Sequence, residues 1–306
     1  MAPVQFANRL KNPIRLCALA LLACAWSPAH AATSVDEHRP ANPQGAVEID
    51  NVAGLIDVQG WDKPEVAVTG TIGKDVERVD VTSDGNRTSI RVVLPKGMHW
   101  GMRDGEANLV IHVPTNSSVS ASVVSSDLKV SAVHGALELR AVSGNISGDG
   151  GGDLRANDVS GDIRFTATAA KRIEARSISG NVVLTAANSD IEASTVSGDA
   201  RLTLGTVSRA RFKTVSGNIT AALAAAAFAQ IDGETVSGDI RLDFTGEPAA
   251  DFDVQTLSGD INNCFGPKPV EPRHGPGRRL TFKTGDTSAR VHLTSNSGEI
   301  RLCTRK

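Results

Sequence analysis

Residues 117–306 consist of short segments in which apolar and polar positions alternate, and each segment ends in Val-Ser-Gly-Asp-Ile or a close variant of it. Apolar residues stand seven and two positions before the central residue of this phrase, and two positions after it, in nearly every copy. Because side chains along a strand alternate between two faces, spacing by two indicates strands. The central residues are Ser126, Gly144, Gly161, Gly180, Gly198, Gly217, Gly238, Gly259 and Gly298.

The repeat length limits the architecture. Successive central residues are 17 to 21 positions apart, except for a last interval of 39. A β-α-β crossover needs roughly 30 residues, so each repeat fits one rung of a parallel β-solenoid, whose rungs lie roughly 4.8 Å apart. The apolar pattern changes parity between five and two positions before the central residue, which predicts a corner there. The predicted fold class is all-β, a parallel β-solenoid or β-helix with short two-strand rungs.

The phrase itself is interpreted as structural rather than catalytic, because a nucleophile is not needed nine times. Its Gly is expected to free the backbone for a bend or to leave room for a neighbouring rung. The residue after the Gly alternates between acid and amide along most of the chain, and most of the Asp copies are followed two positions later by Lys or Arg. Like charges on adjacent strands repel, so this alternation predicts a solvated ladder rather than a metal site. The residues of the ladder are Asp127, Asn145, Asp162, Asn181, Asp199, Asn218, Asp239, Asp260 and Glu299.

Residues 46–116 alternate in the manner of strands but lack the regular phrase, of which Asn51–Leu55 looks like an early copy. We expect this region to form a β cap on the first rung, because a bare solenoid end exposes an unpaired edge and apolar core. A loop at 97–107 holds the most site-like cluster before the repeats, although ordinary hairpin tips have similar compositions. The cluster consists of His99, Trp100, Asp104 and Glu106.

The double-length interval between Gly259 and Gly298 contains four prolines within 266–279, which exclude a central strand there. We expect a protruding loop followed by a strand near Leu280–Lys283, and the alternative is a hidden extra rung within 265–290. Cys264 and Cys303 each lie five residues after a Gly of the phrase, in the same column of neighbouring marked rungs. Their Cα atoms would then be roughly 5 Å apart, which suits a disulfide, whereas an extra rung would separate them by roughly 10 Å.

The first 31 residues resemble an export signal. Three basic residues precede an apolar run, Leu16–Ala25, that is too short to span a bilayer, and Ala29-His30-Ala31 matches a cleavage signature. Alternatively, the segment ending at Cys24 resembles a lipobox, which would place a lipid anchor on that cysteine. After the signal we expect a linker at 32–45, the β cap at 46–116 and the solenoid repeats at 117–306, with 46–306 as one continuous domain. The expected location is the periplasm or the cell surface.

The export signal, the segment Asn51–Trp61, the tetrapeptide Ile111-His112-Val113-Pro114 and the serial Ser-Gly-Asp-Ile copies together resemble the bacterial DUF4097 family of "putative adhesins". The resemblance covers about residues 45–306. It implies a β-helix-like fold, export to the cell envelope and no established activity. Because the family name rests on fold, it supplies no catalytic residues.

The leading functional expectation is a non-enzymatic exported envelope protein, an adhesin or a scaffold that binds a glycan or another envelope protein. The alternatives are a polysaccharide-active enzyme on a β-helix and a periplasmic accessory scaffold without a small ligand. The chain carries 32 basic and 34 acidic residues without a basic stripe, so no nucleic acid partner is expected. No cofactor, metal or transmembrane helix is expected in the mature chain. The candidate contact loop is formed by Arg273, His274, Arg278 and Arg279.

Overall fold

The computed structural model describes residues 33–95, 105–167, 169–270, 276–286 and 289–305. These residues belong to the second of two compact units, Met1–Ala31 and Ala32–Lys306. The predicted export signal, Cys24 and most of the 97–107 loop lie outside the described residues. The strands of the described residues are β1 (Thr33–Pro40), β2 (Ala46–Trp61), β3 (Glu65–Ile72), β4 (Arg78–Ser83), β5 (Arg87–Val93), β6 (Ala107–Pro114), β7 (Ser118–Val133), β8 (Leu137–Ser143), β9 (Ile146–Gly150), β10 (Leu154–Ser160), β11 (Ile163–Ala167), β12 (Arg172–Ser179), β13 (Val182–Ala186), β14 (Asp190–Ser197), β15 (Ala200–Ser216), β16 (Ile219–Ser237), β17 (Ile240–Thr245), β18 (Ala250–Ser258), β19 (Ile261–Asn263), β20 (Arg278–Lys283), β21 (Ala289–Ser297) and β22 (Ile300–Arg305).

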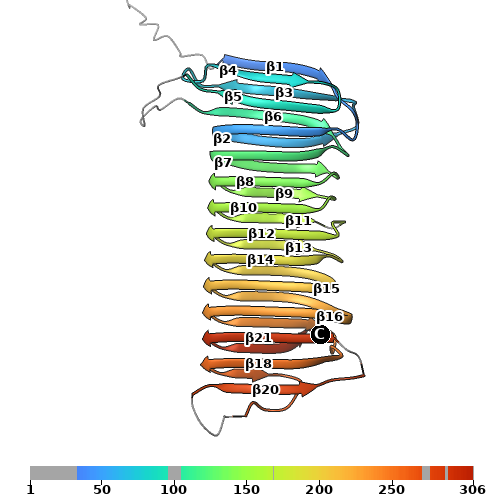
Figure 1. Cartoon of the computed structure of the whole chain (residues 1–306), viewed down its shortest axis with the longest axis vertical. Coiled ribbons are helices and arrows are strands. Elements are labelled where there is room, and N and C mark those ends of the chain that lie inside the picture. Colours follow the sequence, from blue (N-terminus) through green and yellow to red (C-terminus); the bar gives the residue numbers. More distant parts are fainter. Residues whose placement is uncertain (1–32, 96–104, 168, 271–275, 287–288, 306) are drawn as a thin grey trace, which may run out of the picture. The chain divides into compact units, whose positions relative to one another are not determined.

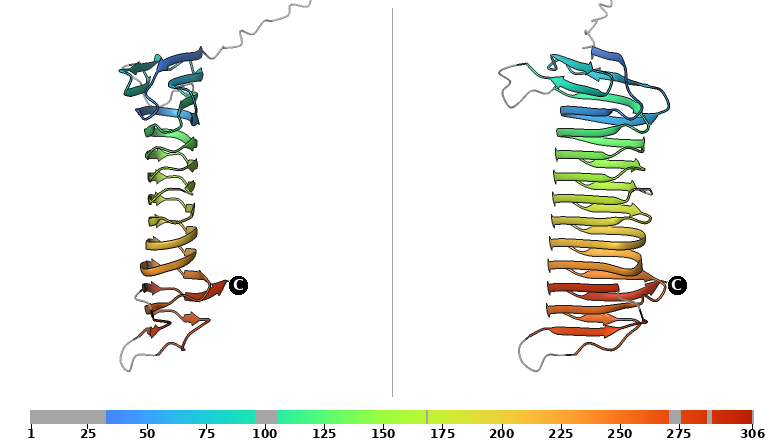
Figure 2. Two further views of the ribbon diagram at one scale, coloured as in Figure 1. Left: turned by 90° about the vertical axis from the view of Figure 1, so that its right-hand side faces the viewer. Right: turned by 45° about the vertical axis from the view of Figure 1, so that its right-hand side comes forward.

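Each repeat forms one rung of two strands, as Figures 1 and 2 show. The first strand of a rung ends at the Ser of the phrase and the second begins two residues after the Gly. The first strands pair with one another in parallel, as β10 does with β8 and β12. The second strands form a parallel ladder of their own, as β11 does with β9 and β13. The predicted all-β parallel solenoid is confirmed.

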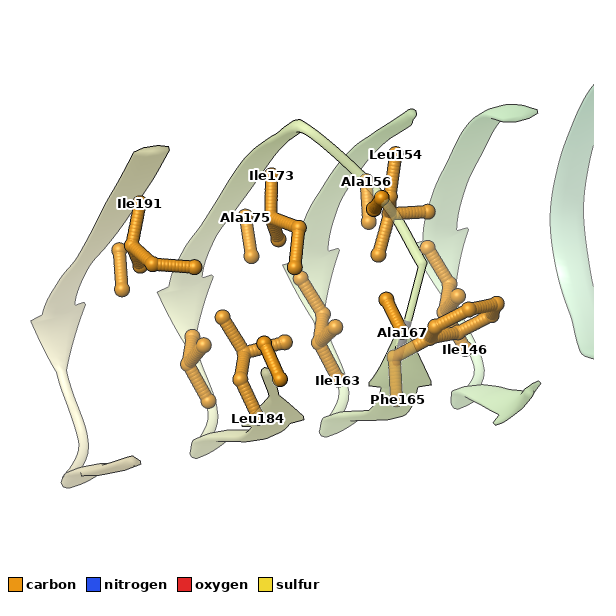
Figure 3. Packing of buried hydrophobic residues seen from close by; sticks show 14 of the residues in the cluster. Ile146, Leu154, Ala156, Ile163, Phe165, Ala167, Ile173, Ala175, Leu184 and Ile191 are labelled. Carbon is orange, nitrogen blue, oxygen red and sulfur yellow. The ribbon is translucent and has the colours of Figure 1, made fainter. Parts of the chain in front are cut away.

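The core lies between these two ladders. Figure 3 shows side chains from both ladders pointing toward one another, Leu154 and Ile173 from one ladder and Ile163 and Leu184 from the other. These four side chains are at most 2% exposed. Burying one such aliphatic side chain stabilises the fold by about 1.5–3 kcal/mol relative to leaving it exposed. Repetition of the inward positions in every rung therefore produces one continuous core.

The corner of the rung lies later than the sequence predicted. The inward positions are seven, five and three residues before the central residue, so the alternation of the first strand continues without a parity change. The apolar residue two positions before the Gly points outward instead, and Val142 is 47% exposed. The bend occurs at the Gly, where Gly180 has a φ of +158°. A Cβ on Gly180 would lie 1.9 Å from the carbonyl oxygen of Gly161, so the Gly also provides clearance for the neighbouring rung.

The amino-terminal end corrects the predicted linker. Within the predicted 32–45 linker, β1 pairs antiparallel with β3, and β3 pairs antiparallel with β6. The segment is polar because it lies at the outer edge of this group, but its backbone supplies partners for β3 that would otherwise be absent. Strand β2 pairs in parallel with β7, and Gly54 lies opposite Ser126 in this register. Asn51–Leu55 is therefore the corner of a first rung, as its likeness to the phrase indicated.

The carboxyl-terminal rung is out of sequence order. Strand β21 lies between β16 and β18 (Figure 1). Strand β22 lies between β17 and β19 in the same way. The rung of Gly298 is thus inserted between the rungs of Gly238 and Gly259, with Gly238 N–H donating to Ser297 and Gly298 N–H donating to Ser258. The strand predicted near Leu280–Lys283 is β20, which pairs antiparallel with β18. The rungs of Gly259 and Gly298 are direct neighbours, so the alternative of an extra rung between them is wrong.

Candidate functional site

The predicted contact loop is only partly described, because Arg273 and His274 lie outside the described residues. The other two predicted residues begin β20. Arg278 forms an ion pair with Asp260 at 2.5 Å, and Arg279 forms one with Asp253 at 3.1 Å. Both guanidinium groups therefore bind β20 to the last rung. The sequence analysis had assigned these two arginines to a contact loop and did not predict this structural role.

The predicted cysteine pair is joined. Cys264 and Cys303 form a disulfide with their Cα atoms 4.9 Å apart, which matches adjacent rungs. Cys303 is 8% exposed and lies beside Asp243 of β17 in the strand register. The disulfide therefore links the inserted rung to the rung that precedes it in sequence and follows it in the stack.

In the order of the rungs, the acid–amide ladder is a continuous chain of hydrogen bonds along the corner from Asp127 to Glu299. The backbone N–H of Asn145 donates to Asp127 Oδ1 at 2.7 Å, and the N–H of Asp162 donates to Asn145 Oδ1 at 3.1 Å. The Asn side-chain amide also donates backward, as Asn181 Nδ2 does to Asp162 Oδ1 at 3.1 Å. An Asn can donate and accept in this way whereas an ionised Asp only accepts, so alternation satisfies both residue types. The N–H of Asn181 and the nearby Arg164 hold the pKa of the Asp162 carboxyl below its usual value.

The basic residues of the ladder follow the prediction in part. Arg164 pairs with Asp162 of its own rung at 2.6 Å. Lys129 instead reaches Asp57 at 3.1 Å, and Arg241 pairs with Asp243 at 2.9 Å. No group of three or more His, Cys, Asp or Glu side chains that could hold a metal occurs within the described ranges.

The outer face of the first strands carries a network of ion pairs. Glu174 accepts from Arg155 at 3.1 Å and from Arg176 at 2.6 Å. Arg176 also binds Glu192 at 2.7 Å and lowers the pKa of that carboxyl. These carboxylates are held by guanidinium groups of neighbouring rungs, which is an arrangement that joins rungs together.

The sequence analysis missed a column of buried hydroxyl groups beside the corner. Hydroxyl groups three positions before the Gly donate to the Gly carbonyl of the neighbouring rung, as Thr195 Oγ1 does to Gly180 at 3.0 Å. Asp158 occupies the same position in its rung and is 4% exposed. Its Oδ1 accepts from the N–H of Ser160 at 3.2 Å, while its Oδ2 is buried without a hydrogen-bond partner in the structure. Burial raises the pKa of the Asp158 carboxyl. The signal in the sequence was an acid where the other rungs carry mostly Ser or Thr.

The apolar residues two positions before the central residue form an exposed line along the corner, which we call the apolar column. Each is 40–53% exposed although the sequence analysis placed it toward the core. Such side chains are normally scattered on a protein surface, and a continuous row is typical of a contact surface. The column consists of Val124, Val142, Val159, Ile178, Val196, Val215, Val236 and Leu257, and Asn296 of the inserted rung separates the last two.

A groove of about 880 Å³ runs along the amino-terminal half of the apolar column. Its floor is formed by column residues from Val124 to Val196 together with Val52. Its sides carry Arg140 and Arg176, which lie four positions before the Gly of their rungs. Because its lining is mostly apolar and includes six side chains of the kind that forms the column, this groove is our candidate functional site.

Comparison with known proteins places the chain in a family without assigning an activity. The sequence model of "Toastrack DUF4097" matches residues 46–303. No curated protein matches the chain. Within the described residues, no helix has the length and hydropathy needed to traverse a bilayer.

Several solved structures are similar to the chain. A "putative adhesin" from Bacteroides fragilis is 13% identical, with a TM-score of 0.44, and the match covers 89% of this chain and 98% of that one. A "putative adhesin" from Parabacteroides distasonis is 14% identical, with a TM-score of 0.43 and the same coverage of 89% and 98%. A "putative lipid binding protein" from Parabacteroides distasonis is 11% identical, with a TM-score of 0.43 and coverage of 87% and 96%. Since the family model spans nearly the whole described chain, the protein belongs to the DUF4097, or Toastrack, family.

Proposed function

We propose that the chain is a non-enzymatic, exported protein of the cell envelope that acts as a binding scaffold, and that the apolar column is its contact surface. The observation that carries the proposal is the line of half-exposed Val and Ile side chains over seven successive rungs, from Val124 to Val236. Exposure of such a row costs solubility in an unbound protein, so its repetition favours a role in contact. The partner class is a surface component of the envelope, a glycan or another envelope protein.

The arrangement of the charged residues supports a binding role rather than catalysis. General acid–base chemistry on a polysaccharide requires two carboxyl groups that face one substrate bond with different protonation states. Here Glu174 and Glu192 are bound by Arg176, and the acid with the raised pKa, Asp158, is buried under the corner. A polysaccharide-active enzyme is therefore the weaker alternative.

Two features support export. The amino-terminal sequence has the form of a signal, and the Cys264–Cys303 disulfide is of a kind that persists in oxidising compartments. We place the mature chain in the periplasm or on the cell surface, either as a free protein after cleavage at Ala31 or as a lipoprotein anchored through Cys24. The intact mass of the protein expressed with its own signal distinguishes the two, since a lipid adds mass at Cys24.

The contact role is tested by sedimentation of the exported protein with purified envelope fragments. A variant in which Val142, Val159, Val215 and Val236 are all replaced by Thr keeps β-branched side chains but makes the column polar. We expect wild-type protein to sediment with the fragments and this variant to remain in solution. The matched control replaces the neighbouring exposed Ser143, Ser160, Ser216 and Ser237 by Ala and should bind as wild type does. Equal binding by both variants would reject the column as the contact surface, and absence of wild-type binding would reject the scaffold itself.

A further inference from the structure

The groove differs from the rest of the apolar column because side chains of β5 and of successive rungs line it as an open trough. At its amino-terminal end, Arg91 and Val92 of β5 lie over the corner beside Val52. Along its length, Arg140, Asn157 and Arg176 form one side. The part of the column that contains Val215, Val236 and Leu257 does not line this groove. Leu257 instead lines a separate cavity of about 300 Å³ beside Arg278 and Arg279, which is less apolar. A ligand that needs a mainly apolar trough is therefore expected in the groove.

The dimensions of the groove suit a single extended chain. It runs from the rung of Val52 to the rung of Val196, which is a length of roughly 24 Å at the usual spacing of neighbouring strands. The hydrocarbon core of a bilayer is about 30 Å thick and contains two layers of acyl chains, so one acyl chain extends over roughly 15 Å. An acyl chain with its head group therefore fits within the groove along the solenoid axis.

The floor of the groove favours an aliphatic ligand over a peptide. Its exposed atoms are mainly those of Val and Ile side chains, and the backbone groups of the strands beneath them pair with neighbouring strands. An extended peptide would bring an N–H and a carbonyl at every residue, and those facing the floor would lose water without gaining a partner. An aliphatic chain brings no such groups.

The charges at the rim favour an anionic head group. The groove is lined by the guanidinium groups of Arg91, Arg140 and Arg176, while its one exposed carboxylate, Asp50, is bound by Arg91 at 3.1 Å. Arg140 pairs with Glu138, and Arg176 with Glu174 and Glu192, but none of these three acids lines the groove. A guanidinium has five N–H donors, so each arginine can bind an oxyanion while it keeps its carboxylate partner.

We propose that this groove binds the aliphatic chain of an anionic single-chain amphiphile, with its carboxylate or phosphate held by Arg140 and Arg176. The proposal rests on the proposed function, because it takes the apolar column as the contact surface and names the ligand of the half that lines the groove. It adds that the two halves of the column differ, since the trough between Val52 and Val196 accepts the chain whereas the ridge beyond it does not.

The test uses a fluorescent fatty acid, 11-(dansylamino)undecanoic acid, titrated into the purified exported chain. The groove variant carries Val142→Ser, Val159→Ser and Ile178→Ser. The matched control carries Val215→Ser, Val236→Ser and Leu257→Ser, which are three changes of the same kind in the same column outside the groove. We expect saturable binding by wild type, a loss of affinity of at least tenfold in the groove variant and a change of less than twofold in the control. Thermal unfolding followed by circular dichroism verifies that both variants are folded.

A second arm separates the head group from the chain. Replacing Arg140 and Arg176 by Gln should weaken displacement of the probe by dodecanoate severalfold and leave displacement by dodecanol unchanged. Inorganic phosphate alone should not displace the probe. The proposal is overturned if wild type does not bind the probe, or if both column variants lose binding equally. It is also overturned if the groove variant alters only the molar mass in light scattering, which would identify a second copy as the occupant. Envelope binding that survives without probe binding would leave the proposed function standing and reject this ligand.

Discussion

The middle of the solenoid and its carboxyl-terminal turn use the same repeat but are assembled differently. From β8 to β15 each rung lies between the rungs that precede and follow it in sequence. Paired residues of neighbouring rungs are therefore only one repeat apart in the sequence. At the carboxyl terminus, β21 and β22 come last in the sequence but lie between the strands of two earlier rungs. The middle can grow one rung at a time, whereas the last turn closes only when the final residues arrive.

This difference shows which contacts depend on the whole chain. The inserted rung contributes Leu293, Ile300 and Leu302, all fully buried, to a core shared with the rungs on both sides. It also carries Cys303, whose disulfide to Cys264 links this turn covalently. A rung in the middle is supported by its neighbours on both sides, but the rung of β18 and β19 depends on the insert for its parallel partners.

The largest effect should follow from removing the insert. Deleting residues 286–306 removes several buried side chains, among them Leu293, Ile300 and Leu302, which each stabilise the fold by about 2–5 kcal/mol, and it leaves β17 and β18 with open edges. We expect amide hydrogens of β18 and β19 to lose protection in hydrogen exchange while those of β10 to β14 keep it. Adding a synthetic peptide of residues 286–306 should restore protection. Equal loss of protection along the whole solenoid would show that the two regions fold as one unit.

The disulfide should matter next. The bridge closes a sequence separation of 39 residues, and chain entropy predicts that its loss destabilises the protein by about 3–4 kcal/mol. We expect a variant with Cys264→Ser and Cys303→Ser to unfold at lower urea concentration, starting with the carboxyl-terminal turn. Cys264→Ser made in the chain without residues 286–306 should show almost no further effect, because Cys303 is already absent and no disulfide can form. A shift in the protection of β10 to β14 would contradict a local role.

The glycines of the middle rungs can be compared with a glycine that has the same backbone freedom but open surroundings. A Cβ on Gly180 would lie 1.9 Å from a backbone oxygen, and its φ is also positive. We expect Gly180→Ala to lower the free energy of unfolding by about 3 kcal/mol, because the neighbouring rung must shift. Gly85 has a φ of +90° and nothing within 4 Å of the added Cβ, so Gly85→Ala should lower the free energy of unfolding by only about 1 kcal/mol. Urea unfolding of the two variants measures the difference, and similar losses would mean that rung spacing adjusts freely.

The sequence predicted the repeating middle well because the fold restates one pattern many times. A column of Ile or Leu at a fixed position could be assigned to the core, and Cys264 and Cys303 could be paired because they occupy one column. The apolar column was misplaced because Val142 and Ile178 have the same residue types as core positions, and the adjacent inward position holds Ser or Thr in most rungs. Composition alone does not separate a half-exposed Val from a buried one.

The order of the rungs at the carboxyl terminus was beyond sequence reasoning for a different reason. The phrase at Gly298 is equivalent to the others, so its register is defined, but nothing in it states which neighbours it will have in space. The double-length interval before it is long enough for the chain to run back past the preceding rung, but it does not specify between which rungs the last one inserts. The polar segment Thr33–Pro40 was missed because an edge strand stabilised through its backbone needs few apolar residues.

The smallest and most specific effect should come from Asp158, the one acid in the column of buried hydroxyl groups. Because its pKa is raised by burial, the folded protein holds this proton at pH values where the unfolded chain has lost it. Its contribution to stability is therefore fully present below the unfolded pKa near 3.8 and is lost as the pH rises through the higher folded pKa.

Asp158→Thr introduces the hydroxyl that Thr195 uses in its own rung. We expect this variant to be more stable than wild type by about 1 kcal/mol at pH 7, because it removes a buried carboxylate oxygen without a partner. The gain should shrink as the pH falls to 4. Thr195→Ser, which retains the hydroxyl, serves as the control and should show no such dependence on pH. A gain from Asp158→Thr that is the same at pH 4 and pH 7 would mean that the side chain, and not its charge, limits the stability of this rung.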